Sequence, residues 1–363
     1  RELKRFRPAL PALSQARHTA GFFSSGEACC RDTETRPAQT AAFNLHVMRP
    51  VVDERSMRLP DGRTLAWAEY GDPFGYPVIL CHGVPGSRRQ VPPFDALTSE
   101  RHARLIVPDR AGYGLSDDMP GWGLADWQSD MAVLVEHLKL GDFAVGGVSG
   151  GAPFACALVE RFGEQVSRLV LVSGVAPGYG RHVGLPMPHR LEARMVWLAV
   201  HAPRLARMVF EPLALVATLW PRTWLAIVRH LVGDADRAEL ARRDIHDMFF
   251  DDLPRATRQG AAAIVRDLAI AASDWALVLN RYAGAVEIVQ GCDDRIVPAD
   301  CASRLAFLFP QASVRLLAGE GHFFVFSRWS EILSALLARR WRHEQGCTAG
   351  LNSGSERRTP VAP

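Results

Sequence analysis

Short apolar runs, bounded by turn residues and separated by helical patterns, constrain the fold of this chain more than any other feature. The runs are Val78–Cys81, Arg104–Val107, Phe143–Val145, Leu169–Val172, Val286–Val289 and Val314–Leu317. Runs that are apolar on both faces are typical of strands buried between layers of helices, as in parallel sheets. The helical patterns are Ala125–Leu138, Ala152–Phe162, Cys301–Phe309 and Trp329–Arg340. This alternation predicts an α/β fold with a mostly parallel, doubly wound sheet.

The alternation begins with a hairpin and is interrupted once. Met57–Tyr70 contains two alternating patterns joined at Asp61-Gly62, which predicts a β-hairpin. The segment from about Gly178 to Trp275 has helical patterning, is rich in Leu, Ala, Arg and Trp, and shows no convincing strand. Its position before the last two strands predicts an inserted helical cap over the strand ends. The predicted layout is a disordered leader at 1–50, core at 51–177, cap at 178–275, core at 276–341 and a disordered tail at 342–363.

Charge and hydropathy exclude several classes of partner. The formal net charge is +3, but residues 1–50 carry +4 and residues 338–363 carry +3, so residues 51–337 carry −4. A mildly acidic body does not fit nucleic-acid binding. No uncharged apolar stretch is long enough for an integral membrane span. Three tryptophans lie among apolar residues of the segment 195–231, and a lid that lines an apolar pocket explains them better than contact with a membrane.

The cysteines and the first residues bear on cellular location. The seven cysteines are odd in number and form no CxxC pair, which argues against a disulfide framework or a zinc site and favours a reducing, cytoplasmic compartment. Residues 1–47 are rich in Arg, Ala, Pro and Ser and lack the apolar region of a secretory signal. They are interpreted as a disordered leader, as an organellar transit peptide, or as sequence upstream of a natural start at Met48.

The motif Gly147-Val-Ser149-Gly-Gly151 lies between an apolar strand and a helical pattern. That context is the one in which G-x-S-x-G forms a sharp strand-to-helix turn that exposes a nucleophilic serine. Small residues on both sides of the serine prevent clashes between neighbouring backbones. The N–H groups at the start of the following helix point toward a developing oxyanion. Ser149 is therefore the predicted nucleophile.

A second loop, His82-Gly-Val-Pro-Gly-Ser87, follows the Val78–Cys81 strand. A loop of this kind places a backbone N–H opposite the nucleophile. The predicted oxyanion donors are the N–H groups of Val84 and Gly150. We interpret His82 as a structural brace of the loop and not as the catalytic base.

A third loop, Pro108–Asp117, follows the Arg104–Val107 strand, and its glycines mark a tight turn. Asp109 and Arg110 are interpreted as structural ion-pairing groups. No companion ligands are spaced around Asp109 for a metal, so neither a metal nor a cofactor is predicted.

Two late loops supply the remaining catalytic groups. Gly291–Pro298 and Gly319–Phe324 each follow a late strand, so both lie at the same end of the sheet as Ser149. Asp293 and Asp294 compete for the acid role, and the pattern Gly-x-x-Asp-x-x-x-Pro selects Asp294. His322 is the predicted base, and the order Ser, Asp, His fits the order of the α/β-hydrolase triad.

Together these loops resemble the α/β-hydrolase superfamily, in the serine-nucleophile branch with His-Gly-x-Pro-Gly-Ser and Asp-Arg-x-Gly-x-Gly-x-Ser loops and an inserted helical cap. The resemblance covers about residues 57–340. It implies catalytic roles for Ser149, Asp294 and His322, with Val84 and Gly150 as oxyanion donors. Serine at the elbow differs from the aspartate of epoxide hydrolases and haloalkane dehalogenases. His82-Gly-Val differs from the His-Gly-Gly of proline iminopeptidases, which argues against aminopeptidase activity.

The expected reaction is hydrolysis of a carboxylic ester of a small to medium apolar molecule through an acyl-serine intermediate. The same triad also serves carbon–carbon bond hydrolases, amidases, acyltransferases and cofactor-free perhydrolases. A ligand-binding protein without turnover and a membrane-associated lipase are further alternatives. The expected partner is a small-molecule ester or related carbonyl compound.

Overall fold

The computed structural model describes residues 53–91, 95–180 and 190–338. Of the two units into which the chain divides, Arg1–Arg36 lies outside the described residues, and Pro37–Pro363 contains every element discussed below. The leader predicted at 1–50 and the tail predicted at 342–363 also lie outside the described residues.

The core is an eight-stranded sheet with the order β1-β2-β4-β3-β5-β6-β7-β8. The strands are β1 (Asp53–Arg58), β2 (Thr64–Gly71), β3 (Tyr76–Cys81), β4 (Ala103–Pro108), β5 (Phe143–Val148), β6 (Val166–Val172), β7 (Ala285–Gly291) and β8 (Ala312–Leu317). β1 and β2 form an antiparallel hairpin, and β2 pairs antiparallel with β4. From β4 to β8 in this order, the strands pair parallel with one another, so their carboxyl ends share one edge of the sheet.

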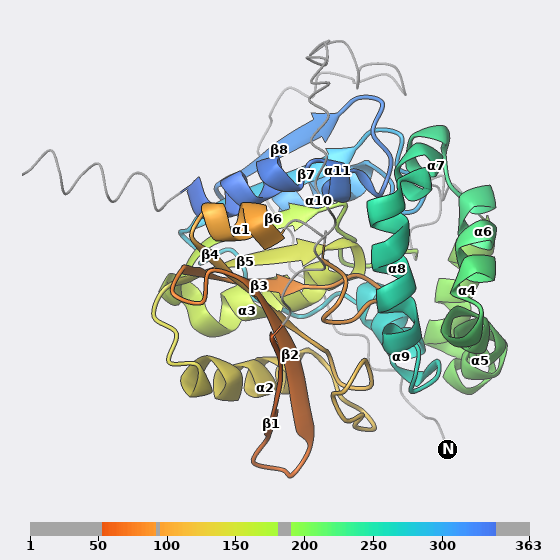
Figure 1. The fold of residues 1–363 in the computed structure, drawn as a ribbon, viewed down its shortest axis with the longest axis horizontal. Coiled ribbons are helices and arrows are strands. Elements are labelled where there is room, and N and C mark those ends of the chain that lie inside the picture. Colours follow the sequence, from red (N-terminus) through yellow and green to blue (C-terminus); the bar gives the residue numbers. More distant parts are fainter. Residues whose placement is uncertain (1–52, 92–94, 181–189, 339–363) are drawn as a thin grey trace, which may run out of the picture. The chain divides into compact units, whose positions relative to one another are not determined.

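Helices cover both faces of this sheet (Figure 1). One apolar core contains residues of α2 (Leu124–His137), α3 (Ala152–Phe162) and α10 (Asp300–Ala306). The core on the other face contains residues of α11 (Phe324–Ser327) and of the helical residues 329–338, with α1 (Asp95–Glu100) beside them. Strands such as β3 and β4 are therefore buried on both faces, as their continuous apolar sequences require.

Residues 190–271 of the segment between β6 and β7 are mainly helical. They contain α4 (Arg190–His201), α5 (Pro203–Leu219), α6 (Pro221–Leu231), α7 (Asp234–Ala241), α8 (Arg243–Ala256) and α9 (Ala262–Ala271). We call residues 190–271 the helical insertion. Figure 1 shows its helices, coloured green to teal, grouped at one side of the sheet. Within 190–275 no residue is in a strand.

The predicted fold class is confirmed, with one error of burial. Each of the predicted apolar runs lies within one of the strands β3 to β8, and the hairpin joined at Asp61-Gly62 is β1–β2. The expectation that Val314–Leu317 is buried on both faces is wrong. β8 is the last strand in the order and has one strand neighbour, and Val314 and Leu316 are 40% and 39% exposed.

Two further properties of the described residues bear on the earlier expectations. None of the described helices has the length and hydropathy needed to cross a membrane. The cysteines in these ranges are free thiols, namely Cys81, Cys156, Cys292 and Cys301. The cytoplasmic location stays a prediction.

Candidate active site

Ser149 lies at a sharp turn where β5 meets the helical turn Ser149–Gly151 and then α3. Its φ of +54° is in the left-handed region, which is uncommon for a residue with a side chain and costs about 1–3 kcal/mol. The turn has no room for side chains at its flanking glycines. A Cβ on Gly151 would lie 2.2 Å from the carbonyl oxygen of Cys81, and one on Gly147 would lie 2.7 Å from Cβ of Ala155. Close packing explains why both positions are glycine.

The structure brings the three predicted catalytic side chains together. Nε2 of His322 lies 3.0 Å from Oγ of Ser149, and Nδ1 of His322 lies 2.8 Å from Oδ2 of Asp294. His322 and Asp294 are both buried, each with 6% of the residue exposed. A buried carboxylate on Nδ1 leaves Nε2 as the acceptor for the serine proton.

The carboxylate of Asp294 also accepts hydrogen bonds from groups other than His322. Its Oδ1 accepts hydrogen bonds from the N–H groups of Ile296 and Val297, both at 2.8 Å, and its Oδ2 accepts one from the amide of Gln290 at 2.9 Å. The competing residue Asp293 is exposed. Of the two aspartates, the geometry therefore favours Asp294 as the partner of His322.

The two predicted oxyanion donors lie next to each other. A Cβ on Gly150 would lie 3.0 Å from Cβ and 3.5 Å from the backbone nitrogen of Val84. Gln90 holds the loop that carries Val84, because its Oε1 accepts from the N–H of Gly83 at 2.7 Å and its Nε2 donates to the carbonyl of Pro85 at 3.0 Å. The loop is thereby fixed beside the turn at Ser149.

His82, Asp109 and Arg110 take part in structural contacts. Nδ1 of His82 lies 2.9 Å from the carbonyl oxygen of Gly83, and burial together with Arg110 lowers the pKa of His82 well below its usual value. Arg110 donates to the carbonyl oxygens of His82 and Gly83. These contacts agree with the interpretation of His82 as a brace of the loop.

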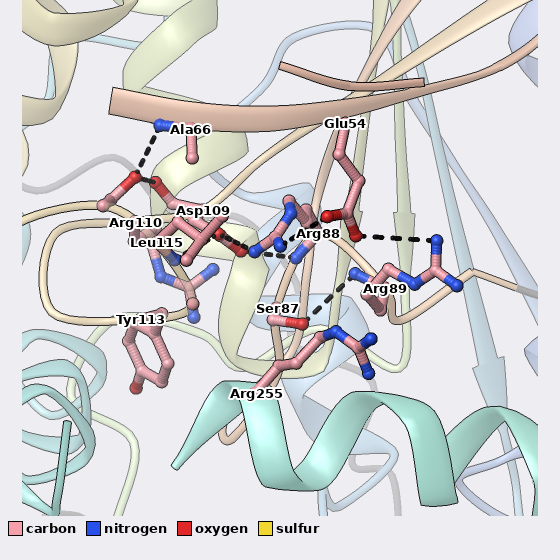
Figure 2. Close-up of polar contacts among 12 residues, drawn as sticks. Glu54, Ala66, Ser87, Arg88, Arg89, Asp109, Arg110, Tyr113, Leu115 and Arg255 are labelled. Carbon is pink, nitrogen blue, oxygen red and sulfur yellow. Dashed lines mark hydrogen bonds and ion pairs between the residues drawn. The ribbon is translucent and has the colours of Figure 1, made fainter. Parts of the chain in front are cut away.

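Asp109 lies at the centre of an ion-pair cluster. Figure 2 shows the Arg88 guanidinium between the carboxylates of Asp109, at 2.6 Å, and Glu54, at 3.1 Å. Asp109 also accepts from the N–H groups of Arg88 and Leu115. The predicted ion-pairing role is confirmed. Within the described ranges, no group of three or more His, Cys, Asp or Glu could hold a metal ion.

A cavity of about 200 Å³ lies over Ser149. Its floor comes from the core and includes Gly83, Val84, Gln90, Ser149, Ile296 and His322. The opposite side comes from the helical insertion and includes Trp224, Val228, Leu240, Phe249 and Leu253. No Lys, Arg, Asp or Glu is among the described residues that line it. The polar side chains of Ser149, His322 and Gln90 are thus set in an apolar wall.

Known proteins match most of the described residues. The family described as having the alpha/beta hydrolase fold matches residues 76–328. The chain belongs to the α/β-hydrolase family. Members of this family are hydrolases, and many solved hydrolase structures share the fold of this chain.

Individual relatives of this α/β hydrolase differ in their named activities. A 2-hydroxy-6-oxo-2,4-heptadienoate hydrolase of Pseudomonas putida is 27% identical over 261 residues, which cover 68% of this chain and 83% of that protein. A proline iminopeptidase of Arabidopsis thaliana is 30% identical over 122 residues, covering 32% of this chain and 31% of that one. A thermophilic esterase from Thermogutta terrifontis has a TM-score of 0.54 at 21% identity, with 80% of this chain and 98% of that chain covered.

In this α/β hydrolase, Asp236 of α7 contacts the loop that carries the candidate base. Its Oδ1 accepts hydrogen bonds from the N–H groups of His322, at 2.6 Å, and Phe323, at 2.8 Å. Asp236 is fully buried, and burial raises the pKa of its carboxyl. A Cβ on Gly321 would lie 2.3 Å from this carboxylate, so glycine is needed where the loop passes it.

Two more buried aspartates of the helical insertion contact other loops of the site. Asp252 of α8 accepts from the N–H of Ser87 at 2.9 Å and from its hydroxyl at 2.6 Å. Burial raises the pKa of Asp252 to about 7. Asp267 of α9 accepts from Nε of Arg110 at 2.8 Å, and both side chains are completely buried.

Sequence reasoning missed these three aspartates because none belongs to a recognisable motif. Asp252 and Asp267 interrupt the buried apolar faces of α8 and α9, next to Leu253 and Leu268. A lone carboxylate on an apolar helix face was the available signal, since such a group requires a partner when buried. Asp236 is in a polar helix and gave no such signal.

Proposed function

We propose that this α/β hydrolase cleaves carboxylic esters of uncharged, apolar molecules through an acyl-serine intermediate. The observation that supports this most directly is the pair of contacts from Ser149 to His322, at 3.0 Å, and from His322 to Asp294, at 2.8 Å. This arrangement of nucleophile, base and orienting acid is the one used for acyl transfer.

The proposed reaction has two halves. Oγ of Ser149 attacks the ester carbonyl carbon while its proton passes to Nε2 of His322, and the N–H groups of Val84 and Gly150 stabilise the oxyanion. The bond to the alcohol oxygen then breaks, and the alcohol leaves with the proton held by His322. A water molecule next gives a proton to His322 and attacks the acyl carbon, so the carboxylic acid departs and Ser149 regains its proton. Asp294 holds the imidazole and stabilises its protonated form.

The walls of the cavity favour an uncharged substrate. The described lining has no lysine or arginine side chain to pair with a carboxylate, which the name heptadienoate implies for the Pseudomonas putida relative. It also has no acidic side chain to pair with the charged amino end of a peptide. Burying either charge without a partner is costly. A neutral ester has no charge to bury, and its carbonyl oxygen has the predicted donors.

We also propose that the helical insertion acts as the predicted cap. Side chains of α6, α7 and α8 form the wall of the cavity opposite Ser149. Such a wall excludes water from the acyl-enzyme and contacts the apolar part of the substrate. The cap proposed here corresponds to the segment predicted at 178–275.

Turnover of p-nitrophenyl butyrate and labelling by a fluorophosphonate probe test the proposal. Ser149→Ala should abolish labelling and lower kcat by about 10⁴-fold or more. Ser129→Ala, at an exposed serine of α2, is the matched control and should leave both unchanged. Because the described lining has no lysine or arginine, 2-hydroxy-6-oxo-2,4-heptadienoate should be a poor substrate. Wild-type turnover by Ser149→Ala would refute the assignment, and efficient turnover of the dienoate would refute the ester preference.

A further inference from the structure

A second cavity, of about 230 Å³, is lined mainly by the helical insertion. Its walls come mainly from α4, α5, α6 and α9, including Met195, Phe210, Ala214, Ala217 and Leu268. We call it the inner chamber. Neither the catalytic triad nor any sequence motif accounts for it.

The inner chamber is suited to hydrocarbon. Thr257 is the one lining residue among those described whose side chain carries a hydroxyl, amide or charge. Its hydroxyl is already engaged, because it donates to the carbonyl of Leu253 at 2.8 Å and lies 2.7 Å from the hydroxyl of Thr218. Apart from the indole N–H of Trp224, the described side chains of the chamber therefore offer a ligand apolar contacts. An apolar space of this kind binds apolar molecules.

The inner chamber adjoins the catalytic cavity. The residues that line both are Val84, Pro85, Trp224, Val228 and Ile296. All five are half-buried, and they form the boundary between the two spaces. Val84 is also a predicted oxyanion donor. A chain attached to a carbonyl held at Val84 and Ser149 would thus start at this boundary.

We propose that the inner chamber binds the distal part of an aliphatic chain whose ester carbonyl lies at Ser149. The substrate class is then a medium- to long-chain fatty ester, an inference that rests on the proposed ester hydrolysis. A water molecule occupies about 30 Å³ in the liquid, so a chamber of about 230 Å³ has room for several methylene-sized groups beyond the catalytic cavity.

A series of p-nitrophenyl esters tests the proposal, from acetate through butyrate and octanoate to decanoate. Each methylene transferred from water into the chamber should raise kcat/KM by up to about fourfold, until the space is filled. A parallel series of alkyl acetates, from ethyl to decyl, followed by acid release, shows whether the acyl or the alcohol chain enters. A rise in kcat/KM with chain length in either series supports the proposal, and a kcat/KM that does not change with chain length in both series overturns it.

A variant that fills the inner chamber can be compared with a matched variant that does not. Ala217→Phe adds a ring to the chamber wall on α5, whereas Ala226→Phe adds the same ring to an exposed position of α6 that lines neither cavity. Ala217→Phe should lower kcat/KM for decanoate at least tenfold and for acetate less than twofold, and Ala226→Phe should change neither. Equal effects on both esters overturn the proposal. Leu213→Trp fills the chamber from another position if Ala217→Phe does not fold.

A binding measurement separates this proposal from the proposed catalysis. In Ser149→Ala protein, the neutral fluorophore N-phenyl-1-naphthylamine should bind and be displaced by methyl decanoate but not by methyl acetate. Adding Ala217→Phe should abolish that binding. Displacement without any ester turnover by the wild type would support the chamber and refute the proposed function. Ester turnover without binding or displacement would support the function and overturn the chamber.

Discussion

Asp236 offers a test of how the helical insertion affects the proposed triad. The carboxylate of this α7 residue accepts the backbone N–H groups of His322 and Phe323 at 2.6 and 2.8 Å. Among the described residues, no hydrogen bond joins Asp236 to Ser149. We therefore expect Asp236 to act by positioning the backbone that carries the imidazole. Asp236→Ala removes Oδ1, the acceptor of both hydrogen bonds, without altering Ser149, Asp294 or the side chain of His322.

The size of the effect follows from these two hydrogen bonds. Each buried N–H left unsatisfied costs about 1–3 kcal/mol, so the pair would cost about 2–6 kcal/mol. The raised pKa of Asp236 shows that burying the carboxylate already opposes folding, so we expect a net loss of stability near the lower limit, about 2 kcal/mol. A shift of about 1 Å in the imidazole would lower the rate by about 10²-fold. We therefore expect kcat to fall about 100-fold in Asp236→Ala, with little change in KM.

Steady-state kinetics with p-nitrophenyl butyrate and thermal unfolding measure both effects. Asp236→Asn keeps an oxygen acceptor and should retain kcat within about tenfold, which a merely charge-based role would not allow. Gly321→Ala should resemble Asp236→Ala, because its Cβ would lie 2.3 Å from the carboxylate. Asp234→Ala changes an exposed aspartate of the same helix and should have no effect. The reasoning is refuted if Asp236→Ala keeps wild-type kcat, or if Asp236→Asn loses as much activity as Asp236→Ala.

Two further predictions concern other carboxylates. Asp294→Asn should lower kcat by about 10⁴-fold, because the amide no longer holds the imidazole in the required tautomer. Asp293→Asn should leave kcat unchanged. Equal kcat values for the two variants would contradict the choice of Asp294. The pKa of Asp252 rises on folding from 3.8 to about 7. Between these pH values the folded protein keeps a proton that the unfolded chain has released. The stability of the fold therefore falls as pH rises through this window. Urea unfolding at several pH values should show that Asp252→Asn removes up to about 4 kcal/mol of this dependence, and parallel profiles for wild type and variant would count against it.

The proximity of the three proposed catalytic residues could be predicted from sequence because the fold brings them together. Ser149, Asp294 and His322 each follow a strand of a parallel sheet, and such strands place their carboxyl ends along one edge. Motifs that are local in the sequence therefore predicted which residues, far apart in the chain, lie close together. The error at β8 has the opposite origin, since a short apolar run gives no indication of whether its strand has one neighbour or two.

The contacts of the helical insertion could not be predicted in this way. Asp236 lies 86 residues from His322, Asp252 lies 165 residues from Ser87, and Asp267 lies 157 residues from Arg110. Helical periodicity identifies the buried face of α8 or α9, but not the loop on which that face packs. The inner chamber is likewise a product of side-chain packing among several helices, and small residues such as Ala214 and Ala217 look like ordinary helix formers in the sequence.

These contacts imply that the helical insertion and the loops of the candidate active site depend on one another. Asp236 of α7 contacts the His322 loop, Asp252 of α8 contacts the loop at Ser87, and Asp267 of α9 pairs with Arg110. Breaking a buried ion pair such as Asp267–Arg110 costs about 3–5 kcal/mol, because the remaining charge has no partner. Displacing the whole insertion would break all three contacts at once, leaving a buried cation and several buried N–H groups unsatisfied. Substrate entry by small shifts of α5 and α6, which contribute walls to the inner chamber and carry none of these aspartates, would leave the three contacts intact.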